Sequence, residues 1–295
     1  MIQALQELRK SKIRTLLIVI TLAFITLMVT FLSSLTQGLS HQSVSALQEV
    51  VQEDAIIISD TSTTLSSSHL TNKQAQELEN IGAYPLYFSH EKNGDTVNVI
   101  MNWKNNDYPS QKHYFDHQEV KWITIQEAQE EKLPISAMII PQDKINKAQN
   151  IDNIKILEGK DRWNLSGAYA GEQLSLNLMI IMLYIVSIII TSAFFIIWTL
   201  QRIPNIAVSL ALGASRRVLV LQSLTQSLII TIISTITGSL STIILITMIS
   251  ESLPAVINSS TILLPSILII LSTIIGSLTS LVPIFKVDPK KALSV

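Results

Sequence analysis

Residues 16–35 read LLIVITLAFITLMVTFLSSL, an unbroken apolar run long enough to cross a bilayer as a helix. This run lies in the first of four stretches that contain no Asp, Glu, Lys or Arg, namely residues 15–48, 174–201, 218–250 and 252–285. Each stretch exceeds the roughly 20 residues that a membrane-spanning helix needs. The chain has 48% hydrophobic residues, 15% charged residues and no cysteine, which excludes a soluble enzyme, a disulfide-built secreted domain and any thiolate site.

Basic residues flank the apolar runs on one side only. The N-terminal segment, the 201–217 loop and the tail after the fourth run together carry ten basic and two acidic residues, whereas residues 36–173 carry eleven basic and nineteen acidic ones. Because positively charged loops resist translocation, we expect a plasma-membrane protein with both termini and the 201–217 loop in the cytoplasm. Topology explains the basic residues, so we expect no nucleic-acid partner.

The sequence therefore predicts an α-helical membrane protein with four transmembrane helices and a mixed α/β extracytoplasmic domain inserted between helices 1 and 2. The first run is longer than the roughly 7–15 residues of a signal-peptide core, and no cleavage motif follows it, so we expect it to remain as a span. The expected segments are a cytoplasmic N-terminal segment (1–15), the first span (16–36), the extracytoplasmic domain with membrane-proximal helical extensions (37–173), the second span (174–201), a cytoplasmic helix and loop (202–217), the third span (218–250), a short extracytoplasmic loop (251–261), the fourth span (262–284) and a cytoplasmic tail (285–295).

The polar insert contains both strand and helix signals. Helices are predicted over residues 71–80 and 125–132, because Thr71 and Thr124 precede them as suitable N-caps. The first helix keeps its apolar period above the membrane, to about residue 51. Short apolar runs predict strands at residues 55–58, 84–88, 96–101, 137–140 and 154–157.

No catalytic constellation is present, because the chain lacks a nucleophile motif, a zinc-protease motif and a phosphate-binding P-loop. His113 and His117 are four residues apart, a spacing that would place two imidazoles on one face of a helix, as metal sites require. Pro109 and residues 105–107 instead favour a polar loop with two solvated histidines. We therefore expect no metal site and no prosthetic group, and no ionisable residue lies mid-span to serve an ion-coupled transporter.

The loop between the second and third runs, QRIPNIAVSLALGASRR (residues 201–217), predicts a short amphipathic helix. Pro204 is suited to begin it and Gly213 to end it. Such a helix could lie in the membrane interface or dock into a groove on a soluble partner.

Two motifs around the last two runs resemble those of MacB/FtsX-type ABC transporter permeases. Residues 210–217, LALGASRR, look like the family's A-L-G-A-S loop, and residues 283–293, PIFKVDPKKAL, look like its closing D-P-x-x-A-L motif. The resemblance implies a non-enzymatic, homodimeric permease in a lipid bilayer, driven by a separate cytoplasmic ABC ATPase that binds ATP and Mg. It also implies a coupling helix for that ATPase, formed by Pro204, Ile206, Val208, Leu210, Leu212, Gly213, Ala214, Ser215 and Arg216.

Three further segments resemble the HrtB-like heme-exporter subgroup of that family. Residues 167–173, GAYAGEQ, are similar to its P-G-Y-x-A-E-Q stretch, although the proline is absent and Ala168 and Gly171 replace the usual Gly and Ala. Residues 31–40 and 54–60 are similar to two other subgroup motifs. The resemblance implies that heme is exported, which would protect the cell from heme toxicity.

Tyr169, Glu172 and Met179 are the candidate heme-binding residues. Tyr169 and Glu172 would point to one side if the second helix already begins there, and Tyr is an attested axial ligand of heme iron. Alternatively, Tyr169 is an aromatic residue of the membrane boundary, Glu172 complements the helix dipole, and Met179 only fills packing space. Two other functions stay open: a permease for a peptide, lipid or antibiotic, and a mechanical signal transmitter that transports nothing.

Overall fold

The computed structural model describes residues 12–93, 96–103, 108–249, 253–279 and 281–282. The chain divides into two compact units. One is the polar domain Gly38–Ser175, and the other consists of the residues before and after it, which form the membrane unit. The closing D-P-x-x-A-L motif and the end of the predicted fourth span lie outside the described residues.

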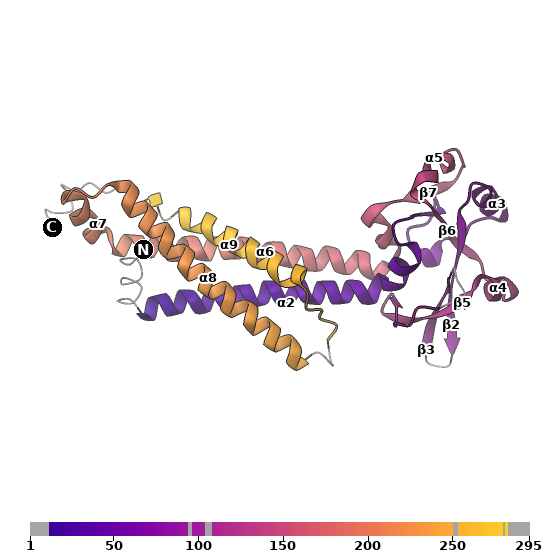
Figure 1. Cartoon of the computed structure of the whole chain (residues 1–295), viewed down its shortest axis with the longest axis horizontal. Coiled ribbons are helices and arrows are strands. Elements are labelled where there is room, and N and C mark those ends of the chain that lie inside the picture. The colour runs from indigo at the N-terminus through magenta and orange to yellow at the C-terminus, as the bar shows by residue number, and fades with distance from the viewer. Residues whose placement is uncertain (1–11, 94–95, 104–107, 250–252, 280, 283–295) are drawn as a thin grey trace. The chain divides into compact units, whose positions relative to one another are not determined.

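Four helices of the described part are long and apolar enough to cross a membrane, as predicted. Figure 1 shows them as α2 (Lys12–Val51), α6 (Gly167–Gln201), α8 (Arg216–Ile249) and α9 (Ser259–Leu278). Helix α2 runs without a break to Val51, the residue to which the sequence predicted that the helical pattern extends.

Small residues let the helices of the membrane unit approach closely. A Cβ on Gly238 of α8 would lie 2.4 Å from the carbonyl oxygen of Ala23 on α2. The hydroxyl oxygens of Thr30 on α2 and Thr242 on α8 are 2.6 Å apart. On α9, a Cβ on Gly276 would lie 2.8 Å from a carbonyl oxygen of α6. In a bilayer, where apolar burial gives little driving force between helices, such close contacts hold the bundle together.

The polar domain is built on one mixed sheet of seven strands in the order β4-β5-β3-β2-β6-β1-β7. All neighbouring strands are antiparallel except β3 and β5, which are parallel. The strands are β1 (Ala55–Ser59), β2 (Tyr84–Asn93), β3 (Thr96–Trp103), β4 (Tyr114–Phe115), β5 (Gln118–Thr124), β6 (Ile135–Ile140) and β7 (Ile154–Leu157). The five predicted strands are confirmed, whereas β4 and β5 were not predicted.

Alternating side chains of β1 are buried on opposite faces of the sheet. Ile56 and Ile58 pack with the end of α2, including Leu47 and Val51, while Ile57 packs on the opposite face. That face is covered by the short helices α3 (Asn72–Asn80) and α5 (Ile145–Ala148), and α4 (Ile125–Glu130) covers a neighbouring part of the sheet. Thr71 and Thr124 are the N-caps of α3 and α4, as predicted, and each forms a capping box with the residue three positions later.

Candidate ligand site at the head of α6

A two-residue turn places the first component of the site. Asp116 and His117 connect β4 to β5, and both have positive φ angles, 47° and 63°, which is the geometry of a type I′ hairpin turn. The turn rests on α2, because the backbone N–H of Asp116 donates to the carbonyl of Ser43 (3.1 Å) and that of His117 to the carbonyl of Gln42 (3.0 Å). Two backbone hydrogen bonds therefore hold the backbone of the turn, from which the His117 side chain extends.

The same turn caps the start of α6. An Asp116 carboxylate oxygen accepts hydrogen bonds from the Ser166 hydroxyl (2.5 Å) and from the backbone N–H of Ala168 (3.2 Å). The Ser166 hydroxyl in turn accepts from the backbone N–H of Tyr169 (3.1 Å). A hydroxyl N-cap with a carboxylate behind it satisfies the free N–H groups and complements the helix dipole. This arrangement begins the helix at Gly167 without the proline of the subgroup motif.

Glu172 is tied to two residues from distant parts of the chain. One carboxylate oxygen is 2.6 Å from Nε2 of His117, and the other is 3.2 Å from the Ser43 hydroxyl, which shares its proton between Glu172 and the Leu39 carbonyl at 2.9 Å. The side chains of His117 and Glu172 are 34% and 31% exposed, so a ligand can reach the pair. Glu172 is thus part of a polar cluster and is not an isolated charge at a helix N-terminus.

The structure brings together some of the candidate heme-binding residues. Because α6 already begins at Gly167, Tyr169 and Glu172 lie about one turn apart on the same helix. Residues three positions apart on a helix lie on the same side, as the candidate heme site requires of this pair. Tyr169 is half-buried. Met179 belongs to the membrane unit, is 49% exposed, and takes no part in the polar cluster.

His113 and His117 do not share a helix face, so the helical arrangement that would suit a metal is wrong for this segment. His113 is buried before β4, with Nδ1 2.9 Å from the carbonyl oxygen of Gln111 and Nε2 3.6 Å from the Glu49 carboxylate. Within the described residues, no group of three His, Asp or Glu side chains could hold a metal ion. His117 is exposed, as predicted, but it contacts Glu172 and does not stand alone in a loop.

The predicted cytoplasmic helix is α7 (Ile203–Ala211), with Pro204 in its first turn and Gly213 at a φ of 92° just beyond its end. Its apolar residues divide between two sides. Ile206 is buried against Leu219 of α8, and Leu210 packs on the same cluster. Pro204, Val208 and Leu212 are exposed, the last two by 46% and 84%. Ala214 and Ser215 link α7 to α8, and Arg216 is the first residue of α8.

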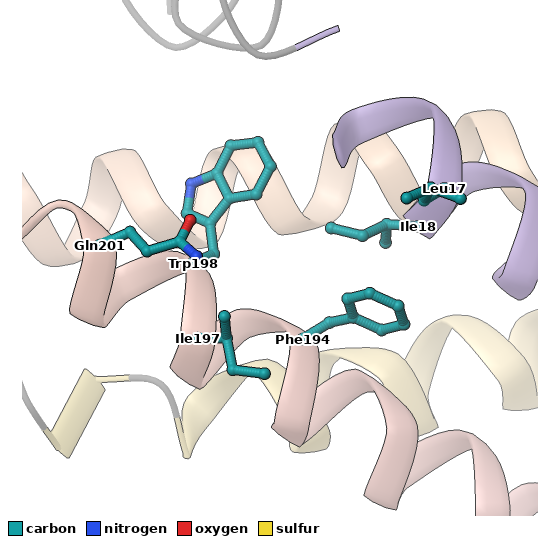
Figure 2. Close-up of a pocket in the computed structure, with 6 residues that line it drawn as sticks. All are labelled: Leu17, Ile18, Phe194, Ile197, Trp198 and Gln201. Carbon is teal, nitrogen blue, oxygen red and sulfur yellow. The ribbon is translucent and has the colours of Figure 1, made fainter. Parts of the chain in front are cut away.

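A small cavity of about 170 Å³ lies between α2 and α6 within the membrane unit. Figure 2 shows Leu17 and Ile18 of α2 on one side, and Phe194, Ile197, Trp198 and Gln201 of α6 on the other. Pockets that enclose a drug-sized ligand have volumes of roughly 300–1,000 Å³. The cavity is too small for a porphyrin, and we do not place a ligand in it.

Comparison with known proteins agrees with this architecture. The model of the family described as "FtsX-like permease C-terminal" matches residues 177–289, which include α7, α8, α9 and nearly all of α6 within the membrane unit. Residues 177–289 thus form an FtsX-like permease domain. Together with the relatives described next, this domain supports a permease of an ABC-type transporter.

Over its whole length, the chain is similar to proteins of two staphylococci. It is 26% identical to a protein of Staphylococcus haemolyticus named "Putative hemin transport system permease protein HrtB", over 98% of both chains. It is 22% identical, again over 98% of both chains, to a protein of the same name from Staphylococcus epidermidis. The similarity therefore extends across the polar domain as well as the spans.

Proposed function

We propose that this chain is the permease subunit of an ABC-type heme exporter, in which heme binds at the head of α6 and is moved outward. Such export protects the cell from heme toxicity. The observation that carries the proposal is the partly exposed Glu172 carboxylate, which contacts His117 and Ser43 one helical turn after Tyr169. The names of the staphylococcal relatives support heme as the cargo.

The proposed orientation follows from the charges beside the spans. The ten basic and two acidic residues of the N-terminal segment, the 201–217 loop and the tail support a cytoplasmic position for these segments. The polar domain is then extracytoplasmic, and the head of α6 lies near the outer membrane boundary. A porphyrin suits that depth, because its flat apolar ring prefers hydrocarbon and its two propionates prefer water.

We propose that two copies form the transporter. Of the four candidate spans, α6 has the smallest buried share, and it exposes Leu178, Met179, Met182 and Ile189 among others. An apolar helix face of this kind is available to lipid, to a second copy or to heme. In a homodimer, two sets of Tyr169 and Glu172 would face a shared path for heme, with Met179 further along each helix.

Coupling to the ATPase runs through α7 in this proposal. Its exposed side, formed by Pro204, Val208 and Leu212, offers an apolar surface to a groove on the cytoplasmic partner. Its buried side carries Ile206, which packs on Leu219 of α8, so a displacement of α7 is transmitted to a spanning helix. ATP and Mg are bound by the partner, and closure of the ATPase dimer pushes on α7.

A hemin titration of the purified full-length protein tests the cargo. We expect a saturable change in the Soret absorption that weakens at least about tenfold, or about 1.4 kcal/mol, in Tyr169→Phe and Glu172→Gln. Tyr184→Phe is the matched control, because Tyr184 lies on the same helix but packs in the core of the membrane unit. No saturable change in the wild type would refute heme binding and leave a peptide, lipid or antibiotic cargo, or a signalling role.

A second experiment tests the coupling surface. Val208→Asp and Leu212→Asp introduce charges on the exposed side of α7, and we expect each to abolish stimulation of the partner ATPase and heme resistance in cells. Hemin binding by the purified variants should be unchanged, because the candidate heme residues belong to another part of the chain. If the variants stimulate the ATPase normally, α7 is not the coupling helix.

A further inference from the structure

His117 is placed where it can act on a ligand together with Glu172. Its backbone is fixed by the type I′ turn and by the hydrogen bond to Gln42, and its imidazole contacts the Glu172 carboxylate through Nε2 at 2.6 Å. A contact this short with a carboxylate is made by an N–H group, so Nε2 carries a proton. In a neutral imidazole the lone pair is then on Nδ1.

Nδ1 of His117 is available to a metal. Within the described part of the chain it has no hydrogen-bond partner, and the side chain is 34% exposed. His113, four residues earlier, differs in both respects, because it is buried and its Nδ1 contacts the Gln111 carbonyl. Of these two histidines, His113 uses its Nδ1 in a contact with the backbone, whereas Nδ1 of His117 has no such contact within the described residues.

The arrangement around His117 is the one that histidine ligands of metals commonly have. Such a histidine donates its second ring N–H to a carboxylate, which fixes the tautomer, orients the ring and makes the ligating nitrogen more basic. Glu172 fills that role here, and the Ser43 hydroxyl holds its other oxygen. Histidine is also an attested axial ligand of heme iron.

We infer that His117 is an iron ligand of the heme site, binding through Nδ1, and that Glu172 is a positioning residue that acts through His117. This inference rests on the proposed function, since it takes heme as the cargo. The coordinate bond would form from the Nδ1 lone pair, while the Nε2 proton stays in the hydrogen bond to Glu172. Tyr169, one turn before Glu172, remains beside the bound heme.

The test uses full-length protein with hemin, and resonance Raman spectra of the reduced complex, where an iron–imidazole stretching band reports histidine ligation. His117→Gly removes the imidazole without straining the backbone, because glycine tolerates the positive φ of 63°. We expect it to lower hemin affinity at least about tenfold and to remove the band, and added imidazole should restore the band. Glu172→Gln should shift the band to lower frequency, because the amide withdraws less of the N–H proton.

His69→Gly, at an exposed histidine of the same domain, is the control and should bind hemin like the wild type. The inference is overturned if His117→Gly keeps both affinity and band, or if its affinity falls but imidazole does not restore the band. It is also overturned if the wild-type complex has no band while Tyr169→Phe loses binding, a result that leaves the proposed function standing. A wild-type protein that binds no hemin overturns both.

Discussion

Gly238 is the position where a single methyl group should do most harm to the membrane unit. A Cβ there would lie 2.4 Å from the carbonyl oxygen of Ala23, 2.7 Å from Cβ of Thr26 and 3.1 Å from the backbone nitrogen of Leu27. Two of these three atoms belong to the backbone of α2 and cannot rotate away. Gly238→Ala must therefore move α2 and α8 apart.

The size of the effect follows from these distances. Ordinary van der Waals contact begins at 3.4 Å, so the helices must separate by about 1 Å at this point. Overpacking of this kind costs about 1–3 kcal/mol, and a similar shift at Thr30 and Thr242 would break their 2.6 Å hydrogen bond, worth about 0.6 kcal/mol in a membrane protein. The gain in helix propensity from Gly to Ala is at most about 1 kcal/mol. We expect a net loss of about 1–2 kcal/mol.

Thermal unfolding of the detergent-purified protein, followed by tryptophan fluorescence, measures this loss. The matched control is Gly171→Ala, also inside a long helix, where a new Cβ would have no atom within 4 Å. We expect Gly171→Ala to keep or raise the melting temperature and Gly238→Ala to lower it by several degrees. Equal melting temperatures for the two variants would refute the close approach of α2 and α8.

Three further predictions concern the polar domain. Arg162 is buried and donates to the carbonyls of Gln52, Asp54 and Gly159; Arg162→Met should leave these acceptors unpaired and lower the free energy of unfolding by about 2–4 kcal/mol, measured by thermal unfolding. Thr71→Ala removes the N-cap of α3, and we expect a loss of about 1 kcal/mol, seen as faster hydrogen exchange of the α3 amides. Hydrogen bonds from Thr124 lower the pKa of Glu127 below its ordinary 4.5, so the contribution of this carboxylate to α4 is present above pH 4.5 and is lost as the pH falls through the lowered pKa. In the wild type, the protection of the α4 amides against hydrogen exchange should fall as the pH drops from 4.5 through the lowered pKa of Glu127. A Glu127→Gln variant should show no such fall.

The spans, the capped helices and most strands could be predicted because their signals are local. A charge-free run of more than 20 residues and a Thr three residues before a Gln or Glu need no knowledge of distant partners. Strands β4 and β5 were missed for the opposite reason. The run QEVKWIT (residues 118–124) has strand-forming residues, but its turn, Asp116-His117, lacks the Asn-Gly or Asp-Gly pair that marks a type I′ hairpin.

Because that hairpin was missed, the sequence predicted only the part of the candidate site that lies on α6. Tyr169 and Glu172 are three residues apart on one helix, so their proximity could be inferred from spacing. Ser43, His117 and Glu172 lie far apart in the chain, and their contacts exist only because the β4–β5 turn rests on α2 and caps α6. Two consecutive residues of the turn make these contacts: Asp116 caps the start of α6, and His117 contacts Glu172. A change in its conformation would therefore disturb both the position of α6 and the histidine together, which links the geometry of the proposed heme site to the start of the helix along which heme would pass.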